Sequence, residues 1–365
     1  MTAVLPADRA LPHEVEAMRR ALDLAARGPV RGPNPRVGCV LLDPGSGRVL
    51  AEGHHRGAGS LHAEADALRD LGRPAAGLTA VVTLEPCAHT GRTGPCTEAL
   101  VSAGVTRVVV GAPDPNPVAA GGADVLAAAG VEVVAGVAAA DSRELNERWD
   151  TAVGRGRPWV TWKWAATLDG RSAAADGSSR WITSPEARAD VHRLRAEHDA
   201  VLVGTGTALA DDPALSVRSH GRVVGPQPLR VVLGRRPVPA GARLRAPGAD
   251  FLQIASHDPV EALQVLQDRE IRSVLLEGGP QVAAAFWRAG LVDEVVAYLA
   301  PALLGAGPQA VGDLGIGAMD DIARLRTRSV SRIGDDVRLV ARPTLTVPTV
   351  LQAAQPLQGC STKEH

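Results

Sequence analysis

The chain lacks most of the features that mark membrane, secreted and nucleic-acid-binding proteins. Only 4 of its 365 residues are cysteines, which argues against a disulfide framework. With 2 Phe, 1 Tyr and a net charge of −1, it offers neither stacking platforms for bases nor long-range attraction to phosphate backbones. No apolar run approaches the length of a membrane span, and the first residues do not have the pattern of a signal peptide. We therefore expect a cytoplasmic protein that binds neither nucleic acid nor membrane.

Lysine is almost absent as well. It occurs only at Lys163 and Lys363, and every other basic residue is an arginine. A coding bias in a GC-rich genome explains this most simply. With 45% hydrophobic residues over 365 positions, the chain can bury the cores of about two to three domains.

Two short strings carry the residues of a zinc deaminase site. The first is His62-Ala63-Glu64, and the second is Glu85-Pro86-Cys87 followed by Gly94-Pro95-Cys96. One imidazole and two thiols supply three zinc ligands and leave a fourth position for water, whose pKa the metal lowers toward neutrality. The carboxylate two residues after the histidine does not bind metal but moves protons. The sequence therefore predicts zinc on His62, Cys87 and Cys96, with Glu64 as the catalytic proton shuttle.

Strand-like and helix-like segments alternate through the first half of the chain. Apolar residues recur at helical spacing over 15–25 and 62–71, and short apolar runs at 37–42, 79–84 and 105–110 are typical of buried strands. This alternation indicates an α/β architecture in which helices cover a sheet. The predicted ligands fall at the carboxyl ends of strands, where such folds place their sites.

The second half repeats the alternation after a Gly- and Arg-rich break at 154–158. Strands expected at 201–203 and 274–276 lead into the turns Gly204-Thr205-Gly206-Thr207 and Glu277-Gly278-Gly279-Pro280. Such turns can present backbone N–H groups to phosphate, although many only close a tight loop. We place the boundary near residue 146, which gives domains 1–145 and 146–342. Residues 343–365 lose all periodicity and are expected to form a disordered tail.

The string from Thr83 to Cys96, Thr-Leu-Glu-Pro-Cys-Ala-His-Thr-Gly-Arg-Thr-Gly-Pro-Cys, resembles the signature of the bifunctional riboflavin-biosynthesis deaminase–reductases. The long spacing between its two cysteines separates this family from cytidine and tRNA deaminases. Further strings at 168–171, 178–184 and 204–215 resemble the reductase part, and the likeness spans residues 13–342. It implies a cytidine-deaminase-like three-layer domain followed by a dihydrofolate-reductase-like domain that binds NADPH.

The resemblance also implies two consecutive reactions and a possible homo-oligomer. The first domain would deaminate 2,5-diamino-6-(5-phosphoribosylamino)pyrimidin-4(3H)-one to 5-amino-6-(5-phosphoribosylamino)uracil, and the second would use NADPH to reduce the ribosyl group to ribityl. The positions that match NADPH contacts are Ala165, Trp181, Thr207, Asp211 and the turn from Gly279. Those that match substrate contacts are Ser179, Arg195, Leu215, Arg218 and Glu277, with Asn34 and His89 as candidates at the deaminase site.

Two other functions remain open at this stage. The chain could be a deaminase of free nucleosides or tRNA whose second half is a recognition domain, but its charge and its cysteine spacing count against that. It could also be a non-catalytic zinc module that binds flavin precursors as a regulator. The glutamate at position 64 counts against a regulator, because a structural zinc site is usually closed by four protein ligands and needs no proton shuttle.

Overall fold

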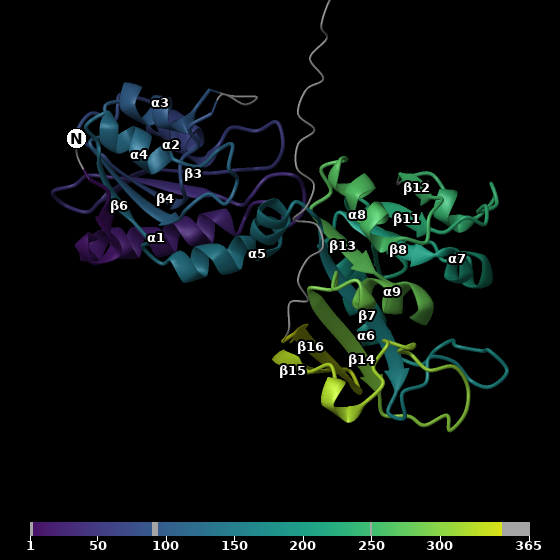
Figure 1. Cartoon of the computed structure of the whole chain (residues 1–365). Coiled ribbons are helices and arrows are strands. Elements are labelled where there is room, and N and C mark those ends of the chain that lie inside the picture. The colour runs from purple at the N-terminus through teal and green to yellow at the C-terminus, as the bar shows by residue number, and fades with distance from the viewer. Residues whose placement is uncertain (1–2, 90–93, 249, 345–365) are drawn as a thin grey trace, which may run out of the picture.

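Each half of the chain folds around its own sheet, and together they form two lobes joined through one helix (Figure 1). The computed structural model describes residues 3–89, 94–248 and 250–344. Most of the expected tail, residues 345–365, lies outside the described residues, and Pro343 is the last residue of a strand. Within the described ranges, no helix combines the length and apolar character needed to cross a membrane.

The first lobe contains a six-stranded mixed sheet. Its strands are β1 (Leu5–Pro6), β2 (Gly38–Leu42), β3 (Val49–His54), β4 (Thr79–Leu84), β5 (Arg107–Ala112) and β6 (Glu132–Ala135). They are ordered β1-β6-β5-β4-β2-β3. The first four in that order run parallel, whereas β2 is antiparallel to both β4 and β3.

Helices cover both faces of this sheet because successive strand residues point to opposite sides. They are α1 (Pro12–Ala25), α2 (Ala63–Leu71), α3 (Cys96–Ser102), α4 (Gly122–Ala128) and α5 (Ala139–Arg155), with a short 3-10 helix, η1 (Ala7–Arg9). On one face, α2, α3 and α4 bury Ala67, Leu100 and Leu126 against the sheet. On the other face, α1 buries Met18 against Val81, and α5 lies on the same side (Figure 1).

The second lobe is built on a longer sheet of eight strands. They are β7 (Trp159–Thr167), β8 (Ala200–Gly204), β11 (Leu229–Leu233), β12 (Phe251–Ile254), β13 (Ser273–Leu276), β14 (Glu294–Ala300), β15 (Leu325–Ile333) and β16 (Asp336–Pro343). The order is β12-β11-β8-β13-β7-β14-β16-β15. The first six run parallel and the last two form an antiparallel edge.

Helices again cover both faces of the second sheet. They are α6 (Pro185–Ala196), α7 (Thr205–Asp211), α8 (Pro259–Gln267) and α9 (Pro280–Arg288), with 3-10 helices η2 (Arg243–Arg245) and η3 (Met319–Asp321). A two-stranded ribbon consists of β9 (Arg218–Ser219) and β10 (Arg222–Val223). Leu263 and Phe286 of α8 and α9 pack in one core, and Leu194 and Ala208 of α6 and α7 pack in the other. The lobes thus share a three-layer plan.

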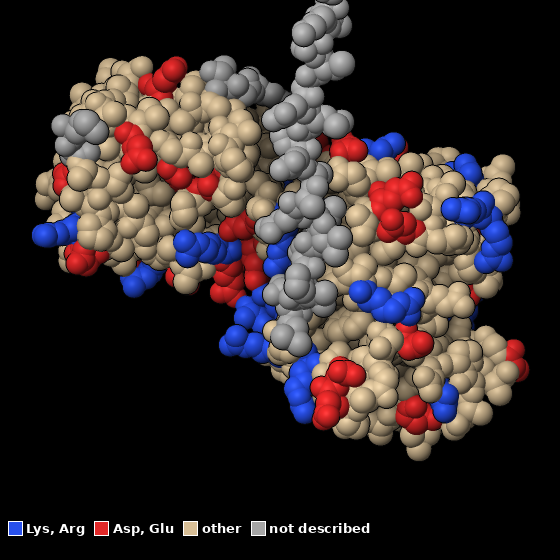
Figure 2. Space-filling model, viewed as in Figure 1, with Lys and Arg blue, Asp and Glu red and all other residues tan. Residues whose placement is uncertain are grey.

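Helix α5 connects the lobes and passes through residues 145 and 146, where the boundary was expected, so that boundary stays a prediction. The lobes are also joined by polar contacts. The backbone N–H of Gly32 donates to Asp199 Oδ1 at 2.6 Å, and Arg342 pairs with Glu147 on α5. Figure 2 shows acidic and basic side chains gathered where the two lobes meet. This junction borders the first of the two sites described below.

Candidate active sites

The predicted zinc ligands converge at the carboxyl end of β4. His62 is the N-cap of α2, Cys96 is the first residue of α3, and Cys87 lies in the loop after β4. Helix α2 can lie this close to the sheet because β3 carries a glycine beneath it. A Cβ at Gly53 would fall 2.3 Å from the backbone oxygen of Ala63.

The three ligand atoms fit one tetrahedral zinc ion. They all lie within 4.8 Å of one another. His62 Nδ1 is 3.2 Å from Cys96 Sγ and 3.7 Å from Cys87 Sγ. Zinc–nitrogen and zinc–sulfur bonds of ordinary length at the tetrahedral angle place such atoms about 3.6 Å apart. Two thiols and one imidazole are also the donor set that zinc prefers, and three protein ligands leave a fourth position open.

The hydrogen bonds within this cluster favour ionisation of one of the two thiols. The hydrogen bond from Cys96 lowers the pKa of Cys87 to about 4, and His62 contributes in the same direction. The hydrogen bond with Cys87 and the burial of Cys96 together raise the pKa of Cys96. A thiolate is the form of cysteine that binds metal, so the arrangement is poised for a cation.

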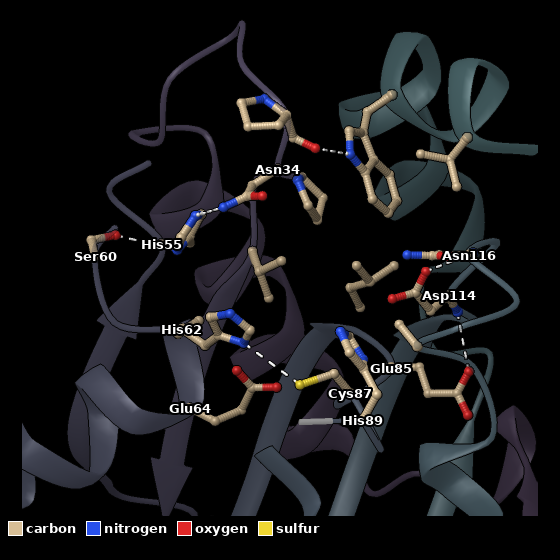
Figure 3. Close-up of a pocket in the computed structure, with 18 of the residues that line it drawn as sticks. Asn34, His55, Ser60, His62, Glu64, Glu85, Cys87, His89, Asp114 and Asn116 are labelled. Carbon is tan, nitrogen blue, oxygen red and sulfur yellow. Dashed lines mark hydrogen bonds between the residues drawn. The ribbon is translucent and has the colours of Figure 1, made fainter. Parts of the chain in front are cut away.

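Glu64 lies in the first turn of α2, and its side chain points toward His62 and Cys87 (Figure 3). The residue is only 3% exposed, and burial raises the pKa of its carboxyl. A carboxyl whose pKa is moved toward neutrality can both accept and donate a proton at the working pH. These are the properties that a proton shuttle beside a metal-bound water requires.

Glu85 has a structural role that the sequence did not reveal. Its two carboxylate oxygens accept hydrogen bonds from the backbone N–H groups of Asp114 at 3.1 Å and Ala123 at 2.9 Å. It therefore ties the loop after β5 and the start of α4 to the metal-ligand loop. Gly122 permits the close approach, since a Cβ there would lie 1.8 Å from the backbone oxygen of Pro86.

A cavity of about 370 Å³ opens above the ligand cluster. Asn34 lines it and is held by His55, whose ring nitrogen Nε2 lies 3.0 Å from Asn34 Nδ2 (Figure 3). His55 Nδ1 lies 3.0 Å from the backbone oxygen of Leu61, so it donates there and Nε2 accepts. The oxygen of the Asn34 amide therefore remains for a ligand. His89 also lines the cavity, and no described residue pairs with its buried Nδ1.

Two carboxyls, Asp114 in the cavity wall and Asp150 on α5 outside the lining, have raised pKa values. Burial raises the pKa of Asp114 to about 6, with Glu85 adding to the shift. Burial and the charge of Asp114 raise the pKa of Asp150, on α5, to about 7. No described residue pairs with the buried Oδ1 of Asp150. The fold therefore makes both groups harder to ionise than a carboxyl in water.

We expect Asp150→Asn to stabilise the protein at pH 8 and to leave it unchanged at pH 4. A carboxyl whose folded pKa lies above its unfolded value costs stability as pH rises from about 4 to 7, and that cost persists above pH 7. Since the group is partly screened by solvent, we expect about 1 kcal/mol, or about 2–4 °C in melting temperature. Melting curves at both pH values test this. The control is Asp23→Asn, an exposed substitution on α1, which should change the melting temperature at neither pH. An equal rise in the melting temperature of Asp150→Asn at both pH values would contradict the prediction.

The second lobe holds a larger cavity of about 610 Å³ beside α6 and the carboxyl end of β7. Seven of the residues predicted to contact cofactor or substrate line it: Ala165, Ser179, Trp181, Arg195, Asp211, Leu215 and Arg218. Trp181 is 69% exposed, and the guanidinium of Arg188 lies 4.5 Å from its ring centroid. Its large exposed ring leaves a surface on which a flat group can stack.

The remaining three predicted residues, Thr207, Glu277 and Gly279, are not among those that line this cavity. Thr207 and Gly279 belong to the two Gly-rich turns, and the backbone N–H of Gly279 donates to Thr207 Oγ1 at 3.1 Å. The turns that follow β8 and β13 are thus held together, as neighbouring parallel strands require. Glu277, at the end of β13, reaches the cavity through its ion pair with Arg195.

Arg195 and Glu277 form a bidentate ion pair. Arg195 Nε donates to Glu277 Oε1 at 2.6 Å, and Nη2 donates to Oε2 at 2.9 Å. Although burial opposes ionisation, Arg195 lowers the pKa of Glu277 to about 2. The fork of Arg195 is therefore occupied by a carboxylate. Arg218, whose Nε donates to Ser216 Oγ at 2.9 Å, is better placed to meet a phosphate.

Lys163 on β7 is a cavity residue that sequence reasoning missed. Its Nζ lies 3.9 Å from Glu277 Oε2 and 5.9 Å from the ring centroid of Tyr298, and burial lowers its pKa. The composition contained a signal. Where nearly every basic residue is arginine, a single lysine within an apolar strand indicates a position that needs a compact ammonium.

Comparison with known proteins assigns both lobes. The first matches the family model for the cytidine and deoxycytidylate deaminase zinc-binding region over residues 12–112, and the second matches the RibD C-terminal domain over residues 158–339. A Mycobacterium tuberculosis protein named riboflavin biosynthesis protein RibD is 49% identical over 318 residues, which cover 85% of this chain and 92% of that protein.

Solved structures agree with this assignment. Acinetobacter baumannii RibD, form 1, superimposes with a TM-score of 0.83 at 40% identity, over 92% of this chain and 100% of that one. A Thermotoga maritima diaminohydroxyphosphoribosylaminopyrimidine deaminase/5-amino-6-(5-phosphoribosylamino)uracil reductase gives a TM-score of 0.79 at 35% identity, over 91% and 99%. The predicted α/β class and the order of a deaminase-like domain before a reductase domain are confirmed.

Proposed function

Because the chain belongs to the RibD family and is a bifunctional deaminase–reductase of riboflavin biosynthesis, we propose that His62, Cys87 and Cys96 hold its zinc and that Glu64 moves the protons of deamination. One observation carries the proposal. The three ligand atoms lie within 4.8 Å of one another beside a buried carboxyl, at the floor of a cavity of about 370 Å³. That is an open metal site with a proton carrier, in a space that admits a ligand.

Zinc held by His62, Cys87 and Cys96 would make hydroxide available near neutral pH. Glu64 takes a proton from the attacking water, passes it to the pyrimidine, and assists the departure of ammonia. The overall step consumes one water and exchanges the amino group for an oxygen. Asn34, fixed by His55, presents its amide oxygen to the ring's N–H groups, and His89 contributes a further polar contact.

In the reductase, NADPH supplies the hydride, and the protein's task is to place its nicotinamide against the sugar carbon. We assign Ala165, Trp181, Thr207, Asp211 and Gly279 to the cofactor. The exposed ring of Trp181 offers a stacking surface. We assign Ser179, Leu215 and Arg218 to the phosphoribosyl substrate, with the Arg195–Glu277 pair fixing the cavity floor. Lys163 adds a positive charge at that floor, where it can orient a sugar hydroxyl.

The proposal includes the setting in which the enzyme works. A reducing cytoplasm would keep the Cys87 and Cys96 thiols free to bind metal, and the substrates would be small phosphoribosyl pyrimidines rather than nucleic acid. Self-association and the boundary between domains 1–145 and 146–342 remain predictions, which sedimentation and expression of the separate halves would test.

The function is tested by supplying the purified protein with the diaminopyrimidinone phosphoriboside and measuring ammonia and NADPH oxidation separately. We expect ammonia first, and NADPH oxidation only after deamination. Removing metal with a chelator should abolish ammonia release and leave NADPH oxidation intact when the deaminated intermediate is supplied, because none of the proposed metal ligands lines the second cavity. Restoring zinc should restore ammonia release.

Two results would contradict the assignment. If zinc-loaded protein released no ammonia, the deaminase substrate would be wrong. If the deaminated intermediate did not elicit NADPH oxidation, the second lobe would not be the proposed reductase. Ammonia release from free nucleosides or from tRNA would favour the alternative deaminase, and bound zinc with no ammonia release from any pyrimidine would favour a regulator.

A further inference from the structure

The second lobe supplies part of the wall of the deaminase cavity. Arg272 lines this cavity together with residues of the first lobe, although it lies immediately before β13, in the reductase sheet. Trp149 and Val153 of the connecting helix α5 also line it. The deaminase cavity is therefore completed by a segment that follows it by more than a hundred residues in the sequence.

The side chain of Arg272 carries an unsatisfied donor. Its Nε is buried, and no described group accepts a hydrogen bond from it. The backbone, by contrast, is held on both sides: the Arg272 N–H donates to Asp199 Oδ2 at 3.1 Å, and its oxygen accepts from the N–H of Trp159 at 2.8 Å. A buried donor without an acceptor is costly, and an anion that arrives with a ligand would supply the acceptor.

Arg272 is the one lysine or arginine among the described residues that line this cavity. The cavity floor carries the groups expected to act on a pyrimidine ring, which are Glu64, His62 and Cys87. We propose that Arg272 binds the phosphate of the phosphoribosyl substrate during deamination, so that the reductase domain supplies the phosphate contact of the deaminase site. This inference rests on the proposed function. It places the ribosyl phosphate at the lobe junction and the ring at the metal ligands.

Asp199 sets the position of this arginine relative to the first lobe. One carboxylate oxygen accepts from the N–H of Gly32, two residues before the cavity residue Asn34, at 2.6 Å. The other accepts from the N–H groups of Arg272 at 3.1 Å and Ser273 at 2.9 Å. A single side chain thus fixes both walls of the cavity, and Asp199 is a positioning residue rather than a ligand contact.

The test compares two substrates in the full-length, zinc-loaded enzyme: the phosphoriboside and the riboside made from it by phosphatase. We expect Arg272→Ala to raise the KM for ammonia release from the phosphoriboside about 10- to 100-fold, the range for losing a hydrogen-bonded charge. The KM for the riboside and the kcat for both should stay within about twofold of wild type. Arg272→Lys should recover part of the loss because it keeps the charge.

Arg269→Ala is the matched control, because it removes an exposed arginine from the same segment and should change neither KM. NADPH oxidation with the deaminated intermediate reports whether the second lobe is folded. If Arg272→Ala fails to fold, Arg272→Met, which retains the apolar stem, answers the same question. Equal KM values for wild type and variant, or an equal rise in KM for both substrates, would overturn this inference and leave the proposed function intact. No ammonia from either substrate with wild type would instead overturn the proposed function.

Discussion

Replacing Glu64 with Gln will reduce the turnover number for ammonia release by at least about 10³-fold, within the range that general acid–base catalysis supplies. The amide keeps the size of the side chain but cannot carry a proton between water, ring and leaving group. Because Glu64 is buried in the first turn of α2 and is not one of the three clustered ligands, zinc content should stay at the wild-type level. NADPH oxidation should also persist when the deaminated intermediate is supplied.

The matched control is Glu98→Gln, which makes the same change at an exposed position in the first turn of α3. Its ammonia release should equal that of wild type. The measurement is steady-state ammonia release together with zinc analysis of the same preparations. If Glu64→Gln kept more than about a tenth of wild-type turnover, another group would have to carry the protons. If it lost zinc, its role would be structural.

That His62, Cys87 and Cys96 gather in the fold could be predicted from the sequence, because short motifs carry them. His62 and Glu64 stand two residues apart at a helix start, and each cysteine sits at a strand-to-helix junction, so short strings already fix their geometry. The alternation of strands and helices predicted the α/β class for the same reason. Arg272 could not be found this way. It reaches the cavity only because β13 lies where the lobes meet, which depends on contacts distant in sequence.

The role of a recognised residue was also harder to predict than its position. Glu85 belongs to the motif, yet its carboxylate accepts hydrogen bonds from two backbone N–H groups, which only the fold brings together. Arg195 was expected to contact the substrate, and it lines the second cavity, but its guanidinium is paired with Glu277. Sequence patterns identify which side chains gather at a site. Which of them neutralise one another depends on distances of a few ångströms.

That neutralisation makes Glu277 important for the stability of the reductase lobe. Its side chain is 8% exposed and faces two cations, Arg195 and Lys163, whose side chains are each 15% exposed. Glu277→Gln preserves the shape and removes the charge, so both cations are left buried without a counter-ion. Breaking a buried ion pair from one side costs about 3–5 kcal/mol. We therefore expect the second lobe to lose about that much unfolding free energy, and NADPH oxidation to fall with it.

The loss should depend on pH in a defined direction. The folded pKa of Glu277, about 2, lies below its unfolded value of 4.5, so its contribution is fully present above pH 4.5 and is lost as pH falls toward 2. Urea unfolding at pH 7 and at pH 3 should therefore show a large difference between wild type and Glu277→Gln at pH 7 and a smaller one at pH 3. The turnover number for ammonia release should persist at pH 7, since its catalytic groups belong to the other lobe.

A second substitution separates the charge effect from simple loss of packing. Adding Arg195→Met to Glu277→Gln removes one of the two unpaired cations and replaces it with an apolar side chain of similar length. Because contacting residues are energetically coupled, the double variant should be more stable than Glu277→Gln alone. If the second substitution lowered stability further by its full single-variant cost, the two side chains would act independently. The 2.6 and 2.9 Å hydrogen bonds between them would then contribute nothing as a pair.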